Sequence, residues 1–251
     1  MSEFRLLETG FQDGYTNMAI DEAVVNLHKK GDKPTIRFYG WKPHAVSIGY
    51  FQGIEEEVDL AKAKELDTDV VRRITGGGAV FHERELTYSF VCTEESNLVS
   101  KKILDSYKMI CGGIVKGLDE LEVKASFVPL NDIIVNGRKI SGNAQTRRER
   151  KVLQHGTLLL GLSVDKMFSL LKVPDEKMKG KIIESVKQRV TSLEQETGRE
   201  YSFKDVSEAM QKGFEKEFGV ELVEGELNEE EKALAEELRE KFSSKEWNFK
   251  R

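Results

Sequence analysis

The stretch that decides the fold is Asp132-Ile133-Ile134-Val135-Asn136-Gly137-Arg138-Lys139-Ile140-Ser141-Gly142. At its centre an Asn-Gly pair separates two runs that contain β-branched residues. A tight hairpin turn needs positive φ at both central residues, and Asn followed by Gly tolerates this best. The stretch therefore predicts two antiparallel strands, 132–135 and 138–142, joined by a two-residue turn.

Around this hairpin, alternating apolar residues predict strands, and apolar residues at helical spacing predict helices. The expected strands are 35–39, 45–50, 70–74, 87–91 and 153–162. The expected helices are 17–29 with Thr16 or Asn17 as N-cap, 54–66, 103–121, one that Ser202 caps, and 228–242. Strands interleaved with helices and hairpins indicate an α+β fold, a mixed β-sheet with flanking helices. Residues 1–251 are expected to form one domain whose portion from about residue 165 is helical.

Composition excludes several classes of function. The 251 residues are 39% hydrophobic and 33% charged, with a formal net charge of −5. No basic stripe suited to nucleic-acid phosphates occurs, and no apolar run approaches a membrane span. Cys92 and Cys111 form no CxxC pair and no secretory signal precedes them. We therefore expect a cytoplasmic protein whose two cysteines are small buried hydrophobic residues.

A glycine-rich turn is the most informative stretch for function: Arg72-Arg73-Ile74-Thr75-Gly76-Gly77-Gly78-Ala79-Val80-Phe81-His82. Three consecutive glycines cost conformational entropy, so the turn requires positive φ or a close backbone approach. Free N–H groups in such a turn can hold an anion, and arginine forks suit phosphate or carboxylate. The spacing matches neither a Walker P-loop nor a Rossmann fingerprint. The alternative is a flexible turn whose arginines face water.

The hairpin lysine, Lys139, is the second candidate. A lysine on a strand that faces a pocket can hold a carboxylate and a phosphate together and stabilise charge that develops between them. The small residues Ser141, Gly142 and Ala144 would keep that wall clear for a ligand. The alternative is a hairpin lysine in solvent. His155, on an apolar strand, is more simply a satisfied core histidine, and the four histidines show no metal-ligand spacing.

Together these stretches resemble the motifs of lipoate–protein ligases, most closely the archaeal, split type. The resemblance runs from about residue 5 to the C-terminus. Its ordered motifs are Arg72-Arg73 with residues 75–82, Asn131-Asp132, Arg138-Lys139-Ile140-Ser141-Gly142-Asn143-Ala144-Gln145, His155-Gly156-Thr157-Leu158, and Ser185-Val186-Lys187-Gln188-Arg189-Val190. The family implies the fold of biotin–protein and lipoate–protein ligases, which is related to class II aminoacyl-tRNA synthetases.

The resemblance also implies a reaction. Lipoate and ATP, with Mg²⁺, give lipoyl-AMP and pyrophosphate. The lipoyl group then passes to a lysine of an apo lipoyl carrier domain, in a 2-oxoacid dehydrogenase acyltransferase or in the H protein of glycine cleavage. By this resemblance Lys139 is catalytic and contacts the acyl carbonyl and the α-phosphate, and Asp132 contacts the metal. The implied nucleotide and acyl site consists of Arg72, Arg73, Gly76, Gly77, Gly78, Ala79, Val80, Phe81, Asn131, Asp132, Lys139, Gly142 and His155.

One departure from longer bacterial ligases concerns the C-terminus. Those enzymes continue into a small accessory domain, for which this sequence, ending at Trp247-Asn248-Phe249-Lys250-Arg251, leaves no room. In split systems a separate small protein supplies that domain. We therefore expect an accessory partner subunit.

Three alternatives stay open. A lipoyl or octanoyl transferase of the same fold uses a cysteine nucleophile and no ATP. In such relatives the cysteine precedes the lysine hairpin, where this sequence has Ser126-Phe127. A biotin–protein ligase would alternate Gly and Arg in its glycine loop, whereas this chain has Arg-Arg before three glycines. A catalytically silent homologue that binds lipoate or carrier domains is the non-enzyme alternative.

Overall fold

A large mixed β-sheet forms the centre of the protein, in a computed structural model that describes residues 2–173 and 176–250. Its eight strands have the order β11 (Val220–Gly225), β1 (Ser2–Gln12), β2 (Thr35–Trp41), β6 (Glu85–Thr93), β10 (Lys151–Leu159), β9 (Arg138–Arg148), β8 (Asp132–Val135) and β7 (Ser126–Val128). β1 runs parallel to both of its neighbours, and the other pairs in this sheet are antiparallel. The expected α+β fold with a mixed sheet is confirmed.

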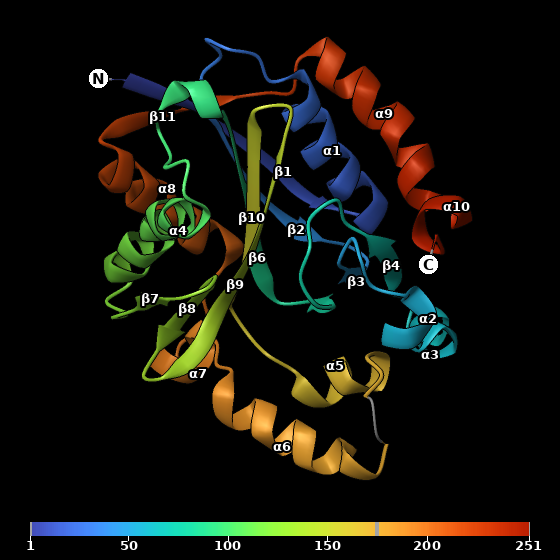
Figure 1. Cartoon of the computed structure of the whole chain (residues 1–251). Coiled ribbons are helices and arrows are strands. Elements are labelled where there is room, and N and C mark those ends of the chain that lie inside the picture. The colour runs from blue at the N-terminus through green and yellow to red at the C-terminus, as the bar shows by residue number, and fades with distance from the viewer. Residues whose placement is uncertain (1, 174–175, 251) are drawn as a thin grey trace.

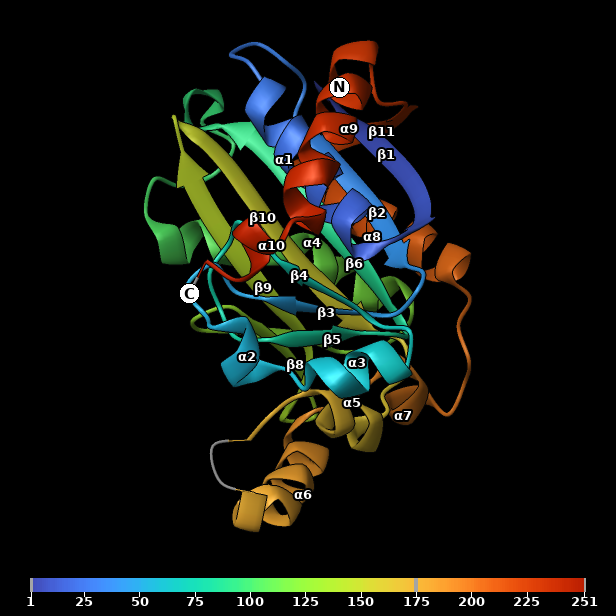
Figure 2. The same ribbon diagram turned by 90° about the vertical axis from the view of Figure 1, so that its right-hand side faces the viewer.

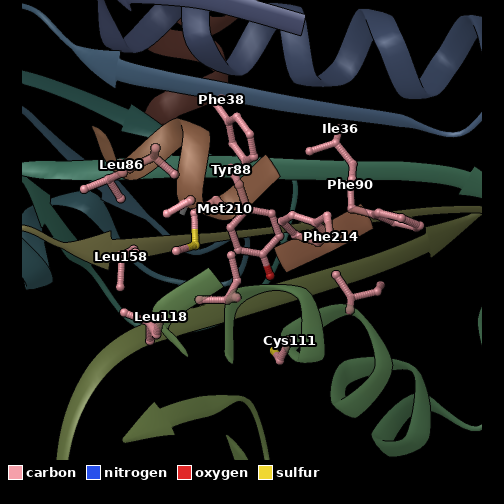
Figure 3. Packing of buried hydrophobic residues seen from close by; sticks show 14 of the residues in the cluster. Ile36, Phe38, Leu86, Tyr88, Phe90, Cys111, Leu118, Leu158, Met210 and Phe214 are labelled. Atoms are coloured by element: carbon pink, nitrogen blue, oxygen red, sulfur yellow. The ribbon is translucent and has the colours of Figure 1, made fainter. Parts of the chain in front are cut away.

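Two helix pairs cover opposite faces of this sheet (Figure 1). On one face α1 (Gly14–Leu27) packs against α9 (Glu229–Ser243). On the other, α4 (Ile103–Glu120) packs against α8 (Phe203–Phe218) over the largest hydrophobic core, part of which is shown in Figure 3. A Cβ on Gly213 would collide with the backbone of Gly117, so glycines inside these helices permit their close approach. The helices α4, α8 and α9 bury residues at spaced positions on one side, whereas α1 is buried on all sides from Asn17 to Val25.

A second, three-stranded sheet lies beside the large one, and Figure 2 shows it from the front. Its order is β4 (Asp69–Arg72), β3 (Ala45–Ile48) and β5 (Val80–His82). A small core joins it to α2 (Ile54–Glu57), α3 (Leu60–Glu65) and α5 (Val164–Leu170). The remaining helices are α6 (Lys179–Arg189), α7 (Leu193–Thr197) and α10 (Lys245–Asn248), with 3₁₀ turns at Glu94–Ser96 and Glu176–Met178. Within the described ranges no helix is both long and apolar enough for a membrane span.

The central hairpin is confirmed: Asn136 and Gly137 have φ of 49° and 77°. Ser202 caps α8 in a capping box, as expected. The N-cap predicted at Thr16 or Asn17 is wrong, because the Asp13 side chain accepts from the Thr16 N–H and α1 begins at Gly14. The helix expected at 54–66 is two short helices, because Val58 between them bridges to Leu171 in extended conformation.

Candidate active site

A cavity of about 280 Å³ opens where the small sheet faces strands β9 and β10 of the large one. Its walls combine small residues, apolar side chains and a few polar groups, the usual composition of a ligand site. The lining residues that matter below are Met18, Tyr39, Trp41, Ser47, Arg73, Gly77, Gly78, Ala79, Val80, Phe81, His82, Thr87, Asn131, Lys139, Ser141, Gly142, Asn143, Ala144, His155, Gly156, Thr157 and Val190. One cavity therefore joins the glycine loop to the lysine hairpin.

Lys139 lies at the mouth of this cavity, with 40% of its side chain exposed. The side chain extends over Gly142, where a Cβ would come within 2.9 Å of Lys139 Cε and Nζ, so glycine at 142 leaves the lysine its space. Nζ lies 2.7 Å from Asp132 Oδ1. This contact is an ion pair, and the buried Oδ1 has no hydrogen-bond partner among the described residues. The carboxylate thus keeps unused capacity for a ligand.

The backbone of Lys139 is fixed by the segment after α6. Val190 forms an isolated parallel bridge with Lys139, and the Thr191 N–H donates to the Lys139 carbonyl over 2.8 Å. Val190 also lines the cavity. The motif Ser185–Val190 follows Lys139 by 46 to 51 positions in the sequence, and its last residue lies beside the lysine in the fold.

The glycine loop forms the facing wall. Gly77 has φ of 98°, a conformation that favours glycine. The Arg73 guanidinium donates to the carbonyls of Gly76 and Gly78 over 2.8 and 2.7 Å. Between described residues, no hydrogen bond has the N–H of Gly76, Gly77, Gly78 or Ala79 as its donor. Carbonyls that are tied to an arginine and N–H groups that are free give this turn the polarity of an anion-binding nest.

Arg73 stabilises the conformation of the glycine loop. Besides the two glycine carbonyls it donates to the carbonyl of Ser47 over 3.0 Å, and it is 5% exposed. Burial lowers the pKa of its guanidinium to about 10, so it stays protonated at neutral pH. Arg73 thus lines the cavity and also shapes the loop.

Arg72 is where the sequence-based site needs correction. Its side chain is fully buried and does not line the cavity. Nη1 donates to the carbonyls of Tyr50 and Gln52, and Nη2 donates to that of Asn248. Neighbouring residues of a strand point to opposite faces, so only one of two consecutive arginines can face the cavity. Arg72 instead joins the β3–α2 turn to α10.

His155 is held in a buried hydrogen-bonded array, as expected for a satisfied core histidine, and it also lines the cavity. Its Nε2 lies 2.6 Å from Thr75 Oγ1, and its Nδ1 lies 3.1 Å from Asp21 Oδ2. Arg37 donates to Asp21 over 2.8 Å. Burial alone would raise the pKa of Asp21, but the His155 hydrogen bond and the Arg37 charge outweigh it and lower that pKa. This array fixes Thr75 at the start of the glycine loop.

A second array of the same type lies on the other side of the loop. His82 Nε2 lies 2.8 Å from Ser47 Oγ, and His82 Nδ1 lies 2.6 Å from Glu85 Oε1. The His82 ring stacks on Trp41 with centroids 4.0 Å apart. Both rings line the buried end of the cavity, away from the exposed lysine. A rigid aromatic surface therefore closes the inner end.

Asn131 is tied to β9 by Asn143. The Asn143 backbone N–H and side-chain amide donate to the Asn131 carbonyl over 3.1 and 2.9 Å. The Asn131 amide donates in return to the Asn143 carbonyl. These bonds hold the turn that precedes Asp132 against the strand that carries Lys139.

Most of the sequence-predicted site converges on this cavity. Lining it are Arg73, Gly77, Gly78, Ala79, Val80, Phe81, Asn131, Lys139, Gly142 and His155. Gly76 and Asp132 are not lining residues but contact them. The Gly76 carbonyl accepts a hydrogen bond from Arg73, and Asp132 forms an ion pair with Lys139. The sequence alone did not indicate a role for Tyr39, Trp41, Ser47, Asn143 and Asp21. His82 and Asn143 lie within the motifs that carry the family resemblance. Their polar side chains inside those motifs could have indicated that they belong to the site.

Asp132 is the candidate metal ligand of this site. Among the described residues, no group of three or more His, Cys, Asp and Glu side chains could hold a metal ion. Mg²⁺ needs fewer protein ligands, because it commonly binds one or two carboxylates together with substrate phosphates and water. The Asp132 carboxylate, which is ion-paired with Lys139 beside the cavity and has no hydrogen-bond partner at Oδ1 among the described residues, fits that pattern.

Comparison with known families gives one domain-level match. The model described as Lipoyl protein ligase A/B catalytic domain matches residues 13–215. Among similar curated proteins, the octanoyltransferase LipM of Clostridioides difficile is 37% identical over 271 residues, and the alignment covers 100% of both chains. That of Geobacillus kaustophilus is 38% identical over 273 residues, covering 99% of this chain and 98% of the relative.

Two solved structures combine a similar fold with similar sequence. One is the bi-partite lipoate protein ligase from Thermoplasma acidophilum, with a TM-score of 0.91 and 34% identity over 99% of this chain and 97% of that chain. The other is a lipoate-protein ligase A bound with ATP, with a TM-score of 0.85 and 32% identity over 98% of each chain. The resemblance seen in the motifs thus extends to the whole fold.

Proposed function

Because the chain belongs to the lipoyl protein ligase A/B catalytic-domain family, we propose that it is an ATP-dependent lipoate–protein ligase. In the first step a carboxylate oxygen of lipoate attacks the α-phosphorus of ATP, and pyrophosphate leaves. In the second, the amine of a carrier lysine attacks the acyl carbon, AMP leaves and the amine loses a proton. The observation that supports this is a single cavity lined by both Lys139 and a turn with free N–H groups.

The charges in this cavity suit an acyl phosphate. The Lys139 ammonium would contact the acyl carbonyl and the α-phosphate, where negative charge develops in both steps. The N–H groups of Gly76 to Ala79 would contact phosphate oxygens, with Arg73 keeping those groups in place. Asp132 would hold Mg²⁺, which neutralises phosphate charge when it is bound. The ammonium would then exchange its contact with Asp132 for one with the substrate.

The inner end of the cavity suits an apolar acyl tail. With the carboxyl group held at the exposed Lys139, the tail would extend toward the buried side chains of Met18, Tyr39 and Trp41. Burying an apolar chain there would be favourable by about 0.8 kcal/mol for each CH₂ group.

A second candidate function is ATP-independent octanoyl transfer, which the LipM relatives favour because they match this chain over its full length. Transfer from a thioester through a covalent intermediate requires a nucleophile in the cavity. The sequence has two cysteines, both fully buried and outside the cavity lining. Burial raises the pKa of the Cys92 thiol to about 11 and that of Cys111 to about 12. These thiols are poor nucleophiles at neutral pH, which favours the ligase.

A two-substrate assay separates these candidates. In one arm the protein receives lipoate, ATP, Mg²⁺ and an apo carrier domain; in the other it receives an octanoyl thioester and the carrier without ATP. We expect mass spectrometry to detect lipoyl-AMP and a lipoylated carrier in the first arm, with activity retained after iodoacetamide treatment. Octanoyl transfer without ATP that iodoacetamide abolishes would establish the transferase instead. Lipoate binding without product in either arm would indicate a non-catalytic homologue.

A separate accessory subunit belongs to this proposal. The similar Thermoplasma acidophilum ligase is described as bi-partite, with an E2 lipoyl domain as its partner. By analogy, we expect adenylate formation to require a second small protein and the acceptor to be an apo lipoyl domain. Pyrophosphate release should therefore rise when extract from the source cells is added to the purified chain. Full turnover by the purified chain alone would contradict the need for a subunit.

A further inference from the structure

A directed chain of hydrogen bonds runs from the protein surface to the cavity on the α4–α8 side of the large sheet. It starts at Arg147, whose Nε donates to Gln145 Oε1 over 3.1 Å. Gln145 Nε2 donates to Gln154 Oε1 over 3.0 Å, and Gln154 Nε2 donates to Tyr88 Oη over 2.7 Å. The last bond runs from the Tyr88 hydroxyl to Asn143 Oδ1 over 2.7 Å.

The direction of this chain is fixed by its first member. An arginine guanidinium only donates, so each amide in turn must present its oxygen toward Arg147 and its nitrogen away from it. Tyr88 therefore accepts a hydrogen bond from Gln154 and donates its single hydroxyl proton to Asn143. The Asn143 amide nitrogen is then left to donate to the Asn131 carbonyl. In such a series each bond polarises the next.

The orientation of these hydrogen bonds matters because Tyr88 and Asn143 are both buried, where a polar group without a partner is costly. Tyr88 is fully buried, and Figure 3 shows it among the apolar side chains of the α4–α8 core. Asn143 is 5% exposed, and Gly156 lies opposite it on β10, where a Cβ would collide with Asn143 Oδ1. Without the Tyr88 hydroxyl, Oδ1 would be an unsatisfied buried acceptor, which costs about 1–3 kcal/mol. The Asn143 side-chain amide would then rotate to find another partner, and its hydrogen bond to the Asn131 carbonyl would be lost.

We infer that Tyr88 is a positioning residue that acts through Asn143 to hold the Asn131–Asp132 turn beside Lys139. Asn143 makes the bonds that fasten Asn131 to β9, and Asp132 follows directly with its carboxylate 2.7 Å from Lys139 Nζ. The inference rests on the proposed function, because the alignment of Lys139 and Asp132 matters only if they act on an acyl phosphate. Tyr88 itself does not line this cavity, so it is not a catalytic residue.

The variant Tyr88→Phe removes the hydroxyl and keeps the ring. We expect the kcat of lipoyl-AMP formation to fall roughly tenfold, as for other residues that orient a site from behind, with the KM for lipoate nearly unchanged. Tyr107→Phe is the matched control, since that hydroxyl bonds the Gln145 backbone rather than Asn143, and it should leave the kcat unchanged. In an Asn143→Ala background, Tyr88→Phe should not lower kcat further, because the Tyr88 hydroxyl acts only through the Asn143 side chain.

Hydrogen exchange gives a readout independent of catalysis. In Tyr88→Phe, peptides spanning residues 129–143 should exchange faster than in the wild type, while α1 and α9 exchange at the wild-type rate. Equal kcat values for Tyr88→Phe and Tyr107→Phe, or additive effects with Asn143→Ala, would overturn the inference. If the wild type forms no adenylate, the proposed function fails, and unchanged exchange at 129–143 would still refute the positioning role separately.

Discussion

The two walls of the cavity are stabilised in different ways. The glycine-loop wall is held by groups that already have partners: Arg73 binds loop carbonyls, Arg72 binds the neighbouring turn, and Thr75 binds His155. The hairpin wall presents Lys139, which is 40% exposed and pairs with Asp132, whose Oδ1 has no hydrogen-bond partner among the described residues. One wall is therefore preorganised, and the other can exchange its partner for substrate.

Because the two walls differ in this way, substitutions in one wall should mainly change stability and substitutions in the other should mainly change catalysis. Substitutions in the loop wall leave buried polar groups unsatisfied, so they should lower the free energy of unfolding. A substitution at Lys139 removes a partly exposed charge, so it should lower the rate and leave the fold intact.

The largest expected effect is on catalysis, in Lys139→Ala. Loss of a cation at the developing charge should reduce lipoyl-AMP formation by roughly 10²–10³-fold. The free energy of unfolding should change by no more than about 0.5 kcal/mol. Pyrophosphate release and urea denaturation measure the two quantities. Lys108→Ala, an exposed lysine on α4, is the control of equal charge change. Near-normal activity in Lys139→Ala would remove the basis of the proposed mechanism.

The second effect is on stability, in Arg72→Met. Methionine fills part of the space but leaves the carbonyls of Tyr50, Gln52 and Asn248 without their donor. We expect the free energy of unfolding to fall by about 3 kcal/mol, the scale for breaking a buried charged network. Urea denaturation measures it, with the exposed Arg199→Met as control. A stable variant that has lost only ATP binding would show that Arg72 belongs to the site after all.

The third effect distinguishes adjacent glycines of the loop. In Gly77→Ala the new Cβ would lie 2.8 Å from Arg73 Nη2 at a φ of 98°, so we expect a loss of about 1–3 kcal/mol. In Gly76→Ala the Cβ enters open space and the N–H is retained, so stability should change little. Thermal unfolding of the pair tests whether the loop is preorganised. Equal stability of both variants would mean that the loop changes conformation at little cost and is not preorganised.

The sequence was sufficient for the hairpin, because turn chemistry is local. Lys139 and the glycine loop belong to different sheets, so their convergence was expected from the family resemblance and not from local patterns. It could not distinguish Arg72 from Arg73, since alternation places one of them in the cavity without indicating which. Strands β1 and β11 were missed because their pairing joins residues more than 200 positions apart. Asp21 was missed for a similar reason: on its helix it is one acidic residue among others, and only the fold brings it to His155.

The smallest expected effect is the dependence of stability on pH through Asp21, behind the loop wall. Its pKa is below the ordinary value in the folded protein, so its ionised form stabilises the fold above the unfolded-state pKa. That contribution is lost as the pH falls through the folded-state pKa. One carboxylate changes the slope by at most about 1.4 kcal/mol per pH unit. Urea denaturation between pH 6 and roughly pH 3 should therefore show a shallower decline for Asp21→Asn than for the wild type. The array links Asp21 to Thr75 through His155, so the same acidification should destabilise the glycine-loop wall first. If the free energy of unfolding falls equally with pH in both proteins, the acid-sensitive group is not Asp21.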